Sequence, residues 1–134
     1  MNYYIARVVA AGFDETVARV VAALKQEGFG VLTDIDVAAT MKQKLGVEFR
    51  RYRILGACNP PLAHKALTAE DKIGVMLPCN VIVQDAGAGK TEVAAIDPRA
   101  AMERVGNPAL AEIAQEVAQR LARVLQALQP RTMA

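Results

Sequence analysis

The sequence is poor in aromatic residues, cysteine and histidine. Its 134 residues include no tryptophan, three phenylalanines, three tyrosines, two cysteines and one histidine. Two thiols cannot build the dense disulfide framework of small secreted domains, so aliphatic side chains must form the core. Hydrophobic residues make up 53% of the chain, which suffices for one core. We expect a single domain over residues 1–129, with a frayed tail at 130–134.

The near absence of net charge argues against several classes of protein. Sixteen basic and 14 acidic residues leave a formal charge of +2, too small to indicate a binder of phosphate backbones. The densest basic cluster, "FRRYR" at 49–53, is interpreted as the solvated side of a strand. No apolar run reaches the roughly 18 residues of a spanning helix, and the N-terminus lacks a signal-peptide pattern. We therefore expect a bacterial-type cytoplasmic protein with reduced cysteines and neither nucleic acid nor membrane as a partner.

The hydrophobic periodicity along the chain predicts an α+β fold. Strands are predicted at 3–10, 30–37, 50–58, 72–85 and 90–96. Helices are predicted at 12–28, 60–71 and 107–129, with a short helix or turn at 38–46. Strands lie next to one another in the middle of the sequence and do not alternate strictly with helices. This order indicates an antiparallel sheet with helices on one face.

Sequence signals mark the ends of two predicted helices. Asp14 is the expected N-cap of the first, and Gly28 suits a left-handed position at its end, where Leu24 would meet Phe29. Its predicted inner face comprises Phe13, Val17, Val20, Val21 and Leu24. Asn107 and Pro108 would begin the last helix. Its predicted stripe comprises Leu110, Ile113, Val117, Leu121, Val124 and Leu128.

The segment "GAGKT" at 87–91 resembles the end of a phosphate-binding loop. Such a loop needs a glycine six residues before its lysine and a helix after it. Gln84 stands at that position, and the residues that follow are typical of a strand. The segment is therefore interpreted as a hairpin turn.

The two cysteines stand in the segments "ACNPPLAH" (57–64) and "LPCNV" (77–81), each directly before an asparagine. Asn59 can cap a short helix that begins at Pro60. Cys58 would then end a strand just ahead of a helix N-terminus, where partial positive charge favours a thiolate. His64 falls about one turn into that helix. Cys79 follows the proline interruption of the next strand, so the two thiols can approach each other if both strands share a sheet.

Each of these residues also has a plain structural interpretation. A free cysteine is usually a small buried hydrophobe, and a lone histidine at a helix end is usually a surface or capping residue. A site of Cys58, Cys79 and His64 would suit Cu(I) or zinc, but its spacing matches no zinc signature. Asp34, Asp36 and Asp97 have no partner at a spacing diagnostic of acid–base catalysis.

The chain also resembles a known family, the bacterial and archaeal domain of unknown function 302. The resemblance covers residues 3–128, and the cysteine segments "ACNP" and "LPCNV" are its most specific parts. It implies an α+β fold similar to the TATA-binding-protein class, with the element order β-α-β(4)-α, and a homodimer. It does not imply DNA binding, because the basic, phenylalanine-wedged saddle is missing. It directs attention to both cysteines, Asn59, Pro60, Pro78 and Asn80.

Three hypotheses for function follow from these observations. The leading one is a non-enzymatic binding module, homodimeric and without a cofactor, that holds a small ligand in a pocket. The predicted ligand-binding residues are Cys58, Asn59, Pro60, His64, Cys79 and Asn80. The alternative is thiol-based sulfur or redox chemistry, or soft-metal handling, through the two cysteines. A third hypothesis is a structural role through dimerisation, for which the candidate surface on the last helices comprises Val105, Leu125 and Leu128.

Overall fold

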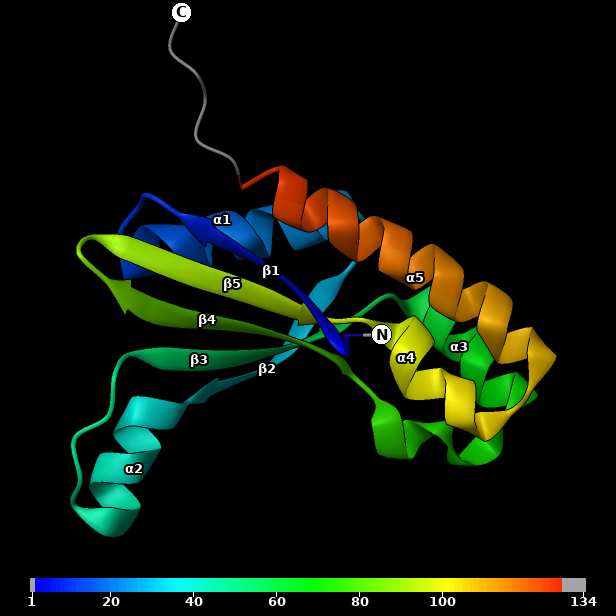
Figure 1. Ribbon diagram of the computed structural model, residues 1–134. Helices are drawn as coiled ribbons and strands as arrows, with labels where there is room; N and C mark the ends of the chain where they lie inside the picture. Colours follow the sequence, from blue (N-terminus) through cyan, green and yellow to red (C-terminus); the bar gives the residue numbers. More distant parts are fainter. Residues whose placement is uncertain (1, 129–134) are drawn as a thin grey trace, which may run out of the picture.

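The computed structural model describes residues 2–128, so the predicted tail at 130–134 lies outside the described residues. Its strands form one antiparallel sheet in the order β1-β5-β4-β3-β2 (Figure 1). They are β1 (Tyr4–Val9), β2 (Gly30–Asp36), β3 (Tyr52–Cys58), β4 (Cys79–Gly87) and β5 (Lys90–Ile96). The prediction of an α+β fold with a single antiparallel sheet is confirmed.

The helices are distributed unevenly around the sheet. Figure 1 shows α1 (Phe13–Gln26) and α5 (Pro108–Gln126) side by side over one face. α2 (Val37–Leu45) stands at the end of β2, away from that layer. At the opposite end, under the first turns of α5, lie α3 (Pro60–Ala69), α4 (Pro98–Met102) and two 3₁₀ turns, η1 (Asp71–Met76) and η2 (Glu103–Val105). The other face of the sheet is not covered by a helix of the described chain.

The core lies between the sheet and the layer of α1 and α5. Successive side chains of a strand point to opposite faces, so every second residue of the central strands enters the core. These residues are Leu55, Ala57, Val81, Val83, Val93 and Ala95, each at most 2% exposed. They pack against the inner faces of α1 and α5, including Val20, Leu24, Leu121 and Val124.

The start of α1 differs from its prediction. Gly12 is the N-cap, and Asp14 lies inside the first turn, because its carboxylate pairs with Arg51 of the segment before β3. Thr16 is buried on the inner face although it was not predicted there, and its hydroxyl donates to the Gly12 carbonyl at 2.7 Å. Val21 is 40% exposed.

The end of α1 follows the prediction. Gly28 has φ +85°, and the Phe29 amide donates to the Leu24 carbonyl at 2.9 Å. This is the hydrogen bond of a Schellman closure, and both side chains are buried in the core. The chain is thereby turned directly into β2.

The strand predicted at 72–85 is wrong in its first half. Asp71–Met76 form the turn η1, the Leu77–Pro78 peptide is cis, and β4 begins only at Cys79. Ile73 is drawn away from the sheet because it packs in a separate apolar cluster with Ala66 and Leu110. The predicted break at Pro78 and the hairpin that follows β4 are confirmed, and Gly87 and Gly89 turn that hairpin with positive φ.

The predicted α5 is confirmed, with its cap. Asn107 accepts a hydrogen bond from the Ala109 amide at 3.0 Å, and Pro108 occupies the first helical position. Leu125 and Leu128 are 6% and 1% exposed, so they pack in the core and cannot form the dimer surface suggested for them. No helix of residues 2–128 is long and apolar enough to cross a membrane.

Candidate functional site

Both cysteines lie where β3 and β4 meet the helices at one end of the sheet. Cys58 is the last residue of β3, Cys79 is the first of β4, and Cys79 pairs directly with Ala57. Both thiols are free. Cys79 is 8% exposed, whereas Cys58 is half-buried. The sheet therefore brings together two segments that are separated by a helix and a turn in the sequence.

The link between β3 and α3 is built by Asn59 and Pro60, as predicted. The Asn59 side-chain oxygen accepts a hydrogen bond from the Leu62 amide at 3.3 Å, which caps α3. Asn59 is 6% exposed, so this polar side chain is held inside the protein. Pro60 starts the helix and is exposed. The cap sends the inner face of α3 over the ends of β3 and β4.

A cavity of about 300 Å³ lies between these elements, and we call it the cysteine cavity. Cys58, Cys79 and Asn59 line it together with apolar side chains of α3, α5 and the turn before β4, among them Leu62, Pro78 and Val117. Leu32 and Leu67 also line it and are 67% and 43% exposed, so they mark its opening. The arrangement is a pocket with mainly hydrocarbon walls that has both cysteines among its lining residues.

The two thiols of the cavity differ in their chemistry. Burial, and then the neighbouring Cys58, raise the pKa of the Cys79 thiol to about 11. Cys79 is thus a neutral thiol at pH 7 and a weak nucleophile. Cys58 is the more accessible of the two, so any reaction at neutral pH begins there.

The predicted three-residue metal site is not formed. His64 lies on the exposed side of α3, because the residues that face inward are Leu62 and Ala66, two positions to either side. Among residues 2–128, no group of three or more histidine, cysteine, aspartate or glutamate side chains could hold a metal ion. The structure brings together the two cysteines alone.

Asn80 is also separated from the cysteine cavity. It follows Cys79 in β4 and therefore points to the opposite face of the sheet. There it lines a shallow hollow of about 420 Å³ on the uncovered face, with Tyr4, Tyr52 and Ile82. Of the six predicted ligand-binding residues, Cys58, Asn59 and Cys79 line one site, while Pro60, His64 and Asn80 lie outside it.

Gly56 and Pro78 close the wall of the sheet next to the cysteines. A Cβ atom on Gly56 would stand 2.2 Å from the Thr33 hydroxyl oxygen and 2.7 Å from Cγ of Pro78. Only glycine allows β2 and Pro78 to approach β3 this closely. Pro78 is thereby fixed against the sheet while it lines the cavity.

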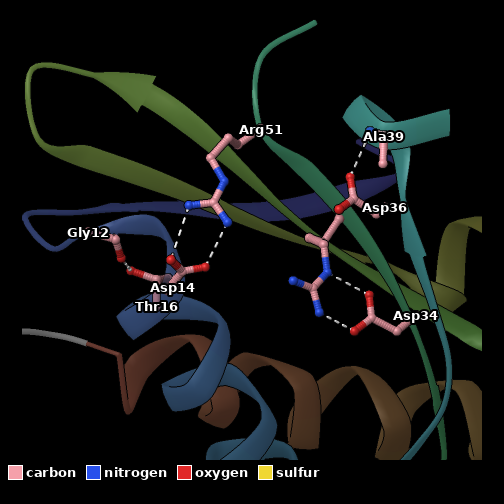
Figure 2. A network of polar contacts seen from close by, with 8 residues as sticks. Gly12, Asp14, Thr16, Asp34, Asp36, Ala39 and Arg51 are labelled. Carbon is pink, nitrogen blue, oxygen red and sulfur yellow. Dashed lines mark hydrogen bonds and ion pairs between the residues drawn. The ribbon is translucent and has the colours of Figure 1, made fainter. Parts of the chain in front are cut away.

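Asp34 and Asp36, which were considered for acid–base catalysis, hold the fold through an ion pair and a helix cap. Figure 2 shows Arg51 with two hydrogen bonds to Asp14, at 2.7 and 3.1 Å, and Asp36 accepting from the Ala39 amide as the cap of α2. Arg53 donates to Asp34 through two nitrogens. These arginine hydrogen bonds lower the pKa of Asp14 and of Asp34.

The basic cluster at 49–53 is accounted for in the same way. Arg50 stacks on the rings of Phe49 and Tyr52, with its guanidinium carbon 4.5 and 5.8 Å from the ring centres. It also donates to Gln84 at 2.7 Å. Arg51 and Arg53 pair with aspartates, as described above. All three arginines of the cluster therefore make contacts within the chain.

Sequence reasoning missed most of the cavity wall. Phe29, Leu62, Met102 and Ile113 come from four distant segments, and each looks like an ordinary core residue in its own helix or turn. No spacing in the sequence connects them. Helices on one face of the sheet were predicted, and the other face carries no helix of the described chain, but its apolar residues, such as Tyr52 and Ile54 of β3, were not proposed as a site.

A family profile and a solved structure both relate the chain to the same family of domains. The profile of the domain of unknown function DUF302 matches residues 5–128. The crystal structure of an uncharacterized conserved protein DUF302 from Bacillus stearothermophilus is similar, with a TM-score of 0.88 and 33% sequence identity. That match covers 96% of this chain and 99% of the other. No curated protein matches the chain.

Proposed function

This chain belongs to the DUF302 family of domains of unknown function, and we propose that it is a non-enzymatic binding module that holds a small apolar molecule in the cysteine cavity. The observation that carries the proposal is the composition of the wall. Asn59 is the one amide side chain among the described lining residues, and its oxygen is already used to cap α3. The remaining lining side chains are hydrocarbon or sulfur.

The wall also defines the class of ligand. A charged molecule would lose its hydration without meeting an opposite charge, because the described lining contains no lysine, arginine, aspartate or glutamate. A neutral molecule with a hydrocarbon body gains by leaving water, by about 25 cal/mol for each Å² buried. The volume of about 300 Å³ is at the lower end of ligand pockets, roughly 300–1,000 Å³. A short alkyl chain or a molecule of two or three aromatic rings would fill it.

The same wall favours binding over catalysis. General acid–base catalysis needs a titratable group within hydrogen-bond reach of the reacting atoms. Apart from the thiols, the described side chains that line the cavity do not titrate, and the Cys79 thiol has its pKa raised to about 11.

The binding proposal is tested with the neutral fluorescent probe N-phenyl-1-naphthylamine. We expect saturable binding of one probe for each chain, and displacement by straight-chain alcohols that improves with chain length until the cavity is full. Ala63→Phe, which places a ring in the cavity wall, should weaken probe binding at least tenfold. Ala69→Phe is the matched control, because Ala69 is exposed on the same helix and does not line the cavity.

Two results would contradict the binding proposal. One is the absence of saturable binding to the folded wild-type chain. The other is equal binding by the Ala63→Phe and Ala69→Phe variants, which would place the probe elsewhere on the surface. Circular dichroism of both variants shows whether the fold is kept.

A second candidate function is thiol chemistry, and the meeting of both free cysteines at one cavity favours it. Cys58 would be the reacting thiol because it is the more exposed. Two sulfur ligands in an apolar setting also suit Cu(I), a soft cation. Protection of both thiols from alkylation by one equivalent of Cu(I) would support this function, and unchanged alkylation would exclude the metal.

The proposal also includes self-association. A family resemblance implies a homodimer, and the uncovered apolar face of the sheet favours it. A location in the cytoplasm stays a prediction.

A further inference from the structure

The face of the sheet opposite α1 and α5 has no helix over it within the described chain. We propose that this face, which we call the open face, is the surface through which two copies of the chain associate. The inference rests on the proposed self-association and assigns it to a surface. The open face carries the alternate residues of all five strands.

A continuous apolar row crosses the middle of the open face. The register of the strands places Ala6, Ala94, Ile82, Ile54 and Ile35 next to one another, in the order β1-β5-β4-β3-β2. At the two edges of the sheet, Val8 is 53% exposed and Ile35 is 48% exposed. No helix among residues 2–128 covers this apolar row, which reaches both edges of the sheet.

The size of the open face fits an interface between two proteins. Strands lie about 4.8 Å apart and residues of one face repeat about every 6.7 Å along a strand, so five strands and three rows project to roughly 500 Å². Projecting side chains increase the accessible area toward the roughly 800 Å² that each partner buries in a standard interface. The apolar part of this area is the middle row together with Tyr4, Val8 and Tyr52 of the outer rows, and an exposed apolar patch of roughly a few hundred Å² often marks an interaction site.

The charges of the open face point to a neutral partner. Its charged strand residues are Lys90 and Glu92 of β5, which have opposite signs, and Glu92 accepts a hydrogen bond from Gln84 at 2.7 Å. Gln84 in turn accepts from Arg50, so the acidic and basic groups belong to one neutral chain of contacts. A strongly charged partner would find no complementary field here. A second copy presents an equally neutral sheet with the same twist, and twisted sheets of one hand pack face to face.

The segment from α2 to β3 extends the open face. Phe49 contacts Tyr52, an open-face residue, with ring centroids 6.2 Å apart. Leu45 and Val47 are 69% and 45% exposed. α2 itself has no buried side chain, and a helix of nine residues is marginal in water without packing. A second copy that covers this segment would supply contacts that one chain lacks.

The experiment measures the mass of the full chain by sedimentation across a range of concentrations. We expect the wild type to sediment with twice the mass of one chain at tens of micromolar. Ile35→Lys and Val8→Lys place a charge at opposite edges of the open face and should each weaken dimerisation at least tenfold. Val75→Lys is the matched control, because Val75 is 88% exposed on η1, outside the open face.

The outcomes separate the two parts of the inference. A monomeric wild type at all concentrations would overturn self-association itself. A wild-type dimer that survives both Ile35→Lys and Val8→Lys would overturn the open face as the surface. Both side chains are about half exposed, so a lysine can extend into solvent at either position, and circular dichroism checks that the fold is kept. Saturable binding of N-phenyl-1-naphthylamine that Ile35→Lys abolishes in a monomer would assign the face to a small ligand instead.

Discussion

The two faces of the sheet are made by the same strands, yet they present opposite situations to the rest of the protein. On the covered face, Leu55, Val81, Val83 and Val93 are fully buried under α1 and α5. On the open face, their immediate neighbours Ile54 and Ile82 are apolar but only partly buried. Apolar character is therefore shared, while burial is not. An apolar strand residue therefore indicates that burial of its side chain would be favourable, but it does not indicate whether the same chain or another molecule buries it.

The largest effect is expected from a pair of neighbouring residues in β3. Leu55→Ala removes a fully buried side chain from the core and should lower the free energy of unfolding by roughly 2–5 kcal/mol. Ile54→Ala, one residue away on the open face, should lower it by less than half as much in dilute solution. Urea unfolding at several protein concentrations measures both changes.

The dependence of the two stability effects on protein concentration separates Leu55→Ala from Ile54→Ala further. The effect of Leu55→Ala should be the same at every concentration, because its contacts lie within one chain. The effect of Ile54→Ala should grow at concentrations where the dimer forms, because association adds to apparent stability. Equal effects of the two variants in dilute solution would contradict the contrast between the faces.

The next largest effect on stability is expected at Gly56 of β3, which lies beside Pro78 of the cysteine cavity. Gly56→Ala forces a Cβ atom against Thr33 and Pro78 and should lower the free energy of unfolding by roughly 1–3 kcal/mol. Gly30→Ala is the matched control in β2, because a Cβ atom there meets nothing within 4 Å. Thermal or urea unfolding compares the two. A Gly56→Ala variant as stable as the control would show that Pro78 is not held against the sheet.

A smaller effect is expected from the ionised cap at the end of β5. Asp97 caps α4 and accepts hydrogen bonds from the Arg99 guanidinium, which lower the pKa of the Asp97 carboxyl. Its unfolded pKa is about 3.9, so its contribution is complete above that pH and is lost as the pH falls through the lower folded pKa. Asp97→Asn should flatten this loss below about pH 4.

The control for the pH experiment is the exposed Glu112 of α5. Glu112→Gln should leave the shape of the acid unfolding curve almost unchanged. If it flattens the curve as much as Asp97→Asn does, the capping carboxylate has no special share in acid stability.

The last test leaves the sequence and the fold unchanged and compares the two thiols. Alkylation by iodoacetamide at pH 7, followed by mass spectrometry, should modify Cys58 well before Cys79. Cys58 is half-buried, whereas Cys79 is buried with its pKa raised to about 11. Faster modification of Cys79 than of Cys58 would contradict the geometry of the cavity.

The sequence by itself determined the local structure, because local structure depends on residues that are neighbours in the chain. Asn59 with Pro60 and Asn107 with Pro108 begin helices in the structure as their chemistry predicts, and Gly28 ends α1 with positive φ. The same signals failed where a distant residue competed. Asp14 was expected to cap α1, but it pairs with Arg51, 37 positions away.

Tertiary structure alone decided the site. It placed Cys79 directly opposite Ala57 and so joined the two cysteines at one cavity. It turned His64 outward on α3 and put Asn80 on the open face, although both stand close to a cysteine in the sequence. The physical reason is that a neighbour in the chain can point to the opposite side of a strand or helix, while residues from distant segments share one wall. Sequence spacing indicates only weakly to which side a neighbouring residue points, and it hardly indicates at all which distant residues share a wall.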